Sequence, residues 1–185
     1  MSHSFFIKSA EFAGSSADVA KCLKPIFPEY AFIGRSNVGK SSLLNMLCGK
    51  KYLAKVSNKP GKTKLINHFL INEKWYLVDM PGYGYAGVSK AEREGWKKWF
   101  AGYFTMRKNL MCTFVLIDSR IEPQKLDMEF MRWLGEKNVP FSMIFTKADK
   151  LTTNQLVKNI SAGRAFKILA TDFLAISIAI LVSLP

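Results

Sequence analysis

Residues 34–41 are the segment that most constrains the fold of this 185-residue chain, because they match the phosphate-binding loop pattern G-x-x-x-x-G-K-[ST]. An apolar, strand-like run precedes them at residues 30–33, and a helix-like run follows at 41–48. The glycines let backbone N–H groups turn towards phosphate oxygens, and the helix adds its positive end. We expect Lys40 to reach the β- and γ-phosphates and Ser41 to bind Mg²⁺. A Gly-rich turn before an ordinary helix would match only rarely by chance, so the segment predicts a nucleoside triphosphate site.

Apolar runs alternate with helical patterns along the chain, which predicts a three-layer α/β fold with a mostly parallel sheet. Strands are expected at residues 5–7, 31–33, 65–71, 75–78, 111–117 and 141–145. The polar residues 72–74 predict that two of these strands form one antiparallel edge hairpin. Helix faces are indicated by Trp96, Trp99, Phe100 and Tyr103, and by Leu126, Phe130 and Leu134. The aromatic positions are expected to face the core rather than to stack on bases.

Two later motifs indicate which nucleotide binds. Asp79–Gly82 reads D-x-x-G and Thr146–Asp149 reads T-K-x-D, and each directly follows an apolar run. The Asp149 carboxylate could accept both the ring N–H and the amino group of guanine, whereas adenine would leave it unpaired. Either motif alone occurs often, as an ordinary turn or as a helix N-terminus. Their order after the phosphate loop favours guanine.

The motifs together resemble the EngB (YihA/YsxC) family of GTPases, in the segments Gly34–Ser42, Pro60–Thr63, Asp79–Tyr85 and Thr146–Asp149. The resemblance implies a P-loop GTPase domain over residues 1–160 that hydrolyses GTP with Mg²⁺. It also implies a role in large ribosomal subunit assembly and in normal septation during cell division. We expect a cytoplasmic monomer with no membrane partner. The odd cysteine count, Cys22, Cys48 and Cys112 without a C-x-x-C pair, fits a reducing compartment.

The motifs and the resemblance assign the site residues. The nucleotide contacts are Gly34, Arg35, Ser36, Asn37, Val38, Gly39, Lys40, Ser41, Ser42, Gly61, Lys62, Thr63, Asp79, Gly82, Thr146, Lys147 and Asp149. The metal ligands among them are Ser41, Thr63 and Asp79. Thr63 would be the switch threonine that binds Mg²⁺ only beside a γ-phosphate, and the Lys147 stem would cover the base.

Catalysis is expected to depend on Lys40, Thr63 and Asn37. Tyr83 follows the D-x-x-G motif where Ras-like proteins have a water-orienting Gln, so intrinsic hydrolysis should be slow. Asn37 resembles the residue that helps to bind K⁺ in potassium-activated GTPases, where the cation can replace an arginine finger. A simple turn residue at this position is an equal alternative.

Charge points to a polyanionic partner. The chain has 27 Lys and Arg against 14 Asp and Glu, a net charge of +13. Residues 50–64 contain six lysines and no acid, and they overlap the predicted switch at Thr63. We expect this segment to bind ribosomal RNA of the large subunit when GTP orders it. A solvated basic surface is the alternative.

The tail, residues 161–185, departs from the family pattern. A member should continue with a helix, a strand, a guanine-contacting loop and a closing helix, whereas this chain has the apolar run 173–184. That run is short for a membrane span and is closer to a buried strand or helix. We therefore expect an incomplete last strand or helix. A native tail and a frameshifted or truncated reading frame both explain the change.

Two other functions remain as alternatives. One is a P-loop ATPase or nucleotide kinase, which ATP preference would reveal. The other is a basic RNA-binding protein that has lost nucleotide turnover.

Overall fold

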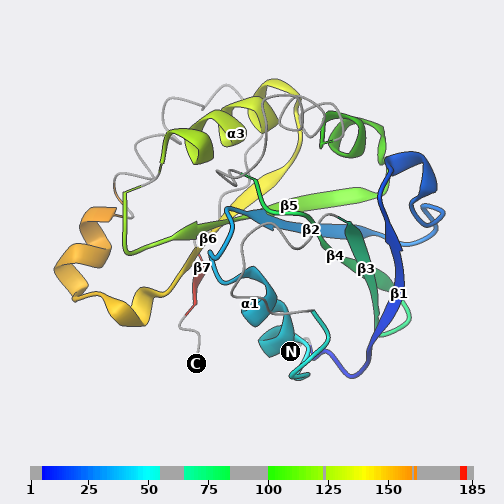
Figure 1. The fold of residues 1–185 in the computed structure, drawn as a ribbon, viewed down its shortest axis with the longest axis horizontal. Coiled ribbons are helices and arrows are strands. Elements are labelled where there is room, and N and C mark those ends of the chain that lie inside the picture. Colours follow the sequence, from blue (N-terminus) through cyan, green and yellow to red (C-terminus); the bar gives the residue numbers. More distant parts are fainter. Residues whose placement is uncertain are drawn as a thin grey trace, which may run out of the picture.

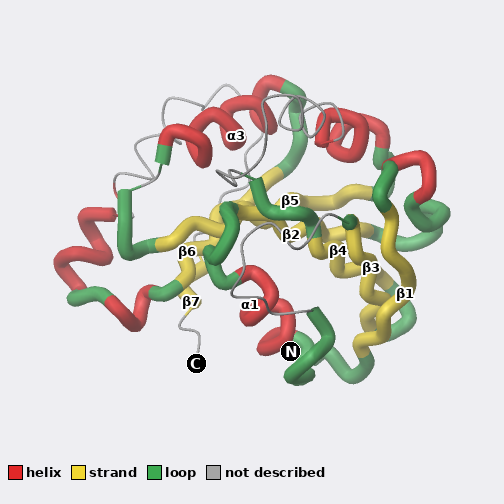
Figure 2. Tube along the Cα trace, in the orientation of Figure 1, coloured by secondary structure: helices red, strands yellow, loops and turns green. Residues whose placement is uncertain are grey.

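The protein folds into three layers, with a central β-sheet between two helical layers (Figure 1). The computed structural model describes residues 6–54, 65–83, 100–122, 124–159, 161 and 180–182. In Figure 2 the helices, in red, lie on both sides of the yellow strands. No helix within these described ranges is long and apolar enough to cross a membrane.

The sheet has seven strands in the order β1-β3-β4-β2-β5-β6-β7. Their bounds are β1 Ala10–Ser16, β2 Glu29–Gly34, β3 Ile66–Ile71, β4 Trp75–Asp79, β5 Leu110–Asp118, β6 Phe141–Thr146 and β7 Ile180–Val182. Strand β3 is antiparallel to both β1 and β4, and the pairs β2–β4, β2–β5, β5–β6 and β6–β7 are parallel. The carboxyl ends of β2, β4, β5 and β6 therefore meet at one edge of the sheet.

The helices divide between the two faces of the sheet. Helix α1 (Lys40–Leu47) lies on one face, and α3 (Lys125–Glu136) lies on the other beside the helical residues 100–106 (Figure 1). Short 3₁₀ turns occur at η1 (Val19–Lys21) and η2 (Ala148–Lys150), and residues 153–159 are helical. Gly49 follows α1 with φ 61°, the left-handed conformation in which glycine commonly ends a helix.

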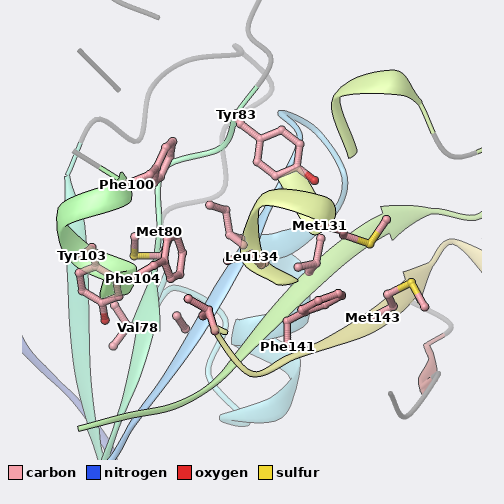
Figure 3. Close-up of a cluster of buried hydrophobic side chains, with 14 of the residues drawn as sticks. Val78, Met80, Tyr83, Phe100, Tyr103, Phe104, Met131, Leu134, Phe141 and Met143 are labelled. Atoms are coloured by element: carbon pink, nitrogen blue, oxygen red, sulfur yellow. The ribbon is translucent and has the colours of Figure 1, made fainter. Parts of the chain in front are cut away.

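Each face of the sheet buries its own apolar cluster. The cluster under α1 includes Leu43, Leu44 and Phe32. The cluster under α3 includes Val78, Met80, Phe104, Met131 and Leu134 (Figure 3). Phe100 and Tyr103 are buried there too, which confirms the core role predicted for that part of the aromatic stripe. Trp96 and Trp99 lie outside the described residues.

Most of the predicted elements are confirmed, but the first strand is wrong. Residues 6 and 7 are not in a strand, residue 5 lies outside the described part, and β1 begins at Ala10. Strand β1 is an edge strand with a bulge between Phe12 and Gly14, and it buries only Ala10 and Ser16. Because so few residues of β1 are buried, its sequence lacks the apolar alternation that would predict a strand. Because β1 pairs outside β3, the β3–β4 hairpin is not itself the sheet edge.

The tail contributes a strand to the sheet. Residues 180–182 form β7, which pairs in parallel with Ile144–Thr146 of β6. This result agrees with the strand alternative for the apolar run 173–184. The predicted absence of a closing helix concerns residues outside the described ranges.

Candidate functional site

The phosphate loop leads from β2 directly into α1, so it lies at the carboxyl end of a central strand. A Cβ at Gly34 would lie 2.8 Å from the carbonyl oxygen of Leu116, and Gly39 has φ 102°. Both positions therefore require glycine. The first N–H groups of α1 lack intrahelical partners, and such a helix N-terminus attracts phosphate.

Lys40 is buried beside the aspartate of the D-x-x-G motif. Its Nζ forms an ion pair with Oδ1 of Asp79 at the end of β4, and the two side chains are 8% and 2% exposed. This pair brings together two residues that were predicted for one site from separate motifs. Removing either partner would leave a buried charge unpaired, which is strongly destabilising.

The predicted Mg²⁺ ligands fit the metal by their chemistry. Ser41 lies half-buried in the first turn of α1, next to Lys40, and Asp79 supplies a carboxylate. Hydroxyl and carboxylate oxygens suit Mg²⁺, which usually binds one or two protein groups together with phosphate and water. Thr63, the third predicted ligand, lies outside the described residues, as do Gly61 and Lys62.

Gly82 packs directly against the phosphate loop. A Cβ on Gly82 would lie 3.0 Å from the Gly34 oxygen and 3.3 Å from the Ser36 nitrogen. The next residue, Tyr83, donates its N–H to the same Gly34 oxygen at 3.2 Å. The D-x-x-G motif thus adjoins the start of the phosphate loop, as its predicted role at the γ-phosphate requires.

The Tyr83 side chain is buried against α3. Its side chain is 8% exposed, and its hydroxyl donates to Oδ1 of Asp127 on α3 at 2.9 Å. Burial, and next the adjacent Asp127 carboxylate, raise the pKa of Tyr83 well above its usual value. The residue therefore stays a protonated donor within the core, in keeping with the expectation that it does not orient water.

Thr146 and Lys147 brace the phosphate loop from the opposite side. The buried Thr146 hydroxyl donates to the Val38 oxygen at 2.6 Å, and Lys147 Nζ donates to the Asn37 oxygen at 2.7 Å. The T-K-x-D motif is thus connected to the phosphate loop through side chains of β6 and the turn after it. Asn37 is exposed, with φ 63°.

Asp118 is a site residue that the sequence analysis missed. It ends β5, and its Oδ2 accepts from Lys147 Nζ at 2.9 Å and from Arg120 Nη2 at 2.8 Å. Burial alone would raise the pKa of Asp118, but these donors lower it to about 2. A signal was present, since Asp118 directly follows the apolar run 111–117 in the sequence, but no motif included it.

Asp149 lies in η2 with its side chain towards solvent. Its Oδ2 lies 3.0 Å from Lys150 Nζ, and a hydrogen bond from Lys150 lowers the pKa of Asp149. Asp149 is exposed, so a base can reach its carboxylate. Two other predicted contacts, Ser36 in the phosphate loop and Ser42 in the first turn of α1, are half-buried.

The strand order and this arrangement of motifs define the class of P-loop GTPase domains. A sequence profile of the family described as 50S ribosome-binding GTPase matches residues 29–147. The probable GTP-binding protein EngB of Christiangramia forsetii is 63% identical over 154 residues, covering 83% of this chain and 78% of that protein. The EngB protein of Porphyromonas gingivalis is 58% identical over 156 residues, covering 84% and 78%. This chain belongs to the EngB family of GTP-binding proteins.

Solved structures agree with the fold. A crystal structure of a probable GTP-binding protein EngB has a TM-score of 0.64 at 26% identity, covering 83% of this chain and 88% of that one. Aquifex aeolicus Era bound to GDP and AlF4⁻ has a TM-score of 0.60 at 21% identity, covering 84% and 50%. These likenesses confirm the predicted α/β P-loop GTPase fold.

Proposed function

We propose that this chain is a GTP-hydrolysing switch that acts in large ribosomal subunit assembly and supports normal cell division, as a cytoplasmic monomer. The observation that carries the switch is the convergence of the phosphate loop, Asp79–Gly82 and Thr146–Asp149 at one edge of the sheet. Family membership favours GTP over the ATPase and nucleotide-kinase alternatives.

Nucleotide binding exchanges one buried ion pair for others. Lys40 transfers from the Asp79 carboxylate to phosphate oxygens, and Asp79 becomes available for the metal. Ser41 and Asp79 would hold Mg²⁺, which would supply positive charge that stabilises the charge developing on the phosphates. The backbone N–H groups of the phosphate loop hold the remaining negative charge. The Tyr83 hydroxyl donates to Asp127, so it is not available to orient water, and we expect slow turnover.

Guanine specificity tests the nucleotide assignment. Asp149→Asn replaces an acceptor that faces the N–H and NH₂ edge of guanine with a group that can also donate. GDP affinity should fall by about 10²-fold or more, and affinity for xanthosine diphosphate should rise, because that edge presents an acceptor. Lys150→Gln is the matched control, since it removes the neighbour of Asp149 and leaves the carboxylate. An unchanged ratio of GDP to XDP affinity would reject the assignment.

The turn after α1 supports the ribosomal RNA proposal. Lys51 is exposed and Tyr52 is 91% exposed, a basic and aromatic pair suited to phosphate contact and base stacking. Asn45 fixes the shape of this turn, because its amide is bonded to the backbone of Lys51 at 3.1 Å and of Ala54 at 3.0 and 2.7 Å. Lys50 is less available than expected, since its ammonium donates to the Ala10 oxygen of β1.

Subunit co-sedimentation across a salt series tests this surface. Replacing Lys51 and Lys55 with Gln should reduce the salt slope of binding by about one to two units, because binding releases fewer counterions when each phosphate contact is lost. Lys108→Gln with Lys137→Gln is the matched control, since both lysines are exposed elsewhere. Tyr52→Ala should weaken binding without changing the slope, and a GTP analogue should bind better than GDP. If binding changes neither with salt nor with the Lys51 and Lys55 substitutions, the segment 50–64 is only a solvated basic surface.

A further inference from the structure

Arg35, Tyr83 and Asp127 form a closed ring of contacts on the α3 side of the phosphate loop. Tyr83 donates its N–H to the Gly34 oxygen and its hydroxyl to Asp127 Oδ1, at 3.2 and 2.9 Å. Arg35 Nε lies 3.2 Å from Asp127 Oδ2, which closes the ring because Arg35 adjoins Gly34. Arg35 and Tyr83 also form a parallel β-bridge, and Figure 3 shows the Tyr83 ring beside α3.

Asp127 is a fixed anchor for this ring. It is 1% exposed, and its Oδ2 also accepts the N–H of Gln124 at 3.1 Å, as part of the capping box that begins α3. The Tyr83 ring packs on Phe130 of the same helix, with ring centroids 4.8 Å apart. The start of the segment after D-x-x-G is therefore tied to α3, an element that supplies no predicted nucleotide contact.

We propose that Tyr83 and Asp127 are positioning residues that hold Gly82 against the phosphate loop and thereby favour triphosphate over diphosphate. The inference rests on the proposed contact between the Gly82 N–H and a γ-phosphate. The ring already fixes Gly82 next to Gly34 and Ser36. Binding of a triphosphate therefore spends less free energy on ordering Gly82. GDP has no γ-phosphate, so its affinity does not depend on where Gly82 lies.

Tyr83→Phe tests the proposal, because it removes one hydroxyl and keeps the ring on Phe130. With Mg²⁺ present, affinity for a non-hydrolysable GTP analogue should fall about threefold to tenfold, the range expected for the net contribution of one intramolecular hydrogen bond. GDP affinity should change less than about twofold. Tyr103→Phe is the matched control, since Tyr103 is also buried and donates to a carboxylate, Glu29, at 2.8 Å. It should lose similar thermal stability and keep the ratio of the two affinities.

Gly82→Ala distinguishes the positioning role of Tyr83 from the proposed contact between the Gly82 N–H and a γ-phosphate. A methyl group there would lie 3.0 Å from the Gly34 oxygen and would move the Gly82 N–H away from its place, so the ratio of triphosphate to diphosphate affinity should fall further than in Tyr83→Phe. If Gly82→Ala leaves the ratio unchanged, the γ-phosphate contact itself fails. If Gly82→Ala lowers the ratio but Tyr83→Phe leaves it unchanged or raises it, the positioning role is overturned and the γ-phosphate contact stands.

Discussion

Thr146 and Thr113 are buried threonines on neighbouring strands, and their hydroxyls have different surroundings. Thr146 Oγ1 donates to the Val38 oxygen at 2.6 Å and lies 3.3 Å from the Ile117 oxygen, so it connects β6 to the phosphate loop. Thr113 Oγ1 has no hydrogen-bond partner among the described residues. The Thr146 hydroxyl therefore contributes to the shape of the site, whereas the Thr113 hydroxyl does not.

Valine at each position gives a matched comparison. Thr146→Val removes the donor and leaves the Val38 oxygen unsatisfied, so GDP affinity should fall roughly fivefold and the free energy of unfolding by about 1–3 kcal/mol. Thr113→Val should leave GDP affinity unchanged and stability unchanged or slightly higher, because no hydrogen bond is lost. GDP titration and urea unfolding of both variants measure this. Equal effects of the two substitutions would contradict the bracing role.

At the scale of the element, the phosphate loop is held from both sides. Lys147 contacts the Asn37 oxygen on the β6 side, and Tyr83 contacts the Gly34 oxygen on the α3 side. Asn37 has φ 63°, a left-handed conformation that asparagine adopts more readily than most residues. This conformation accounts for an asparagine in the turn, and the cation role of its side chain stays a prediction.

Hydrolysis rates in K⁺ and Na⁺ test the cation role. We expect faster GTP hydrolysis in K⁺, because a cation beside the phosphates stabilises the developing charge. Asn37→Gly keeps the left-handed turn while removing the amide, so it should erase the difference between the two salts. Asn138→Gly is the matched control, since Asn138 is exposed with φ 53° at the end of α3. Equal wild-type rates in both salts would reject the cation role and leave the GTPase assignment intact.

At the scale of the whole molecule, a second buried charged cluster lies at the opposite end of β2 from the phosphate loop. Glu29, at the start of β2, is fully buried and accepts from Tyr103 at 2.8 Å and from Arg107 Nε at 3.1 Å, with His68 Nε2 3.4 Å away. Arg107 also donates to the Leu23 oxygen at 2.9 Å. Burial alone would raise the pKa of Glu29, but the surrounding donors lower it to about 2. The cluster joins β2, β3 and the segment after the helical residues 100–106, so it serves stability.

The Glu29 cluster predicts acid sensitivity. A carboxyl group whose pKa falls from 4.5 to about 2 on folding stabilises the protein fully above pH 4.5, and this stability is lost as the pH falls towards 2. At about 1.4 kcal/mol per pH unit, the loss is on the order of 3 kcal/mol. Urea unfolding at pH 4.5, 3.5 and 2.5 measures it. Glu29→Gln should be less stable at pH 7 and show a shallower acid dependence, whereas an unchanged dependence would contradict the assignment.

The sequence by itself determined the class of fold and the motifs that meet at the site. The glycine spacing at residues 34 and 39 permits one kind of phosphate loop, and the buried runs of β5 and β6 indicate parallel strands. Each motif follows a strand, and carboxyl ends of parallel strands meet at one edge. Local patterns were sufficient here because the backbone conformation and the burial of a residue depend largely on the residue itself and its neighbours in the sequence.

Only the tertiary structure decided how the motifs support one another. Asp118 and Asp127 belong to no motif, and the edge strand β1 has too few buried residues to show a period. Whether Lys50 is free, and whether Tyr83 faces water or α3, depends on partners 40 or more residues away. These contacts join segments that are distant in the chain, and no local pattern specifies which side chain a buried donor will meet.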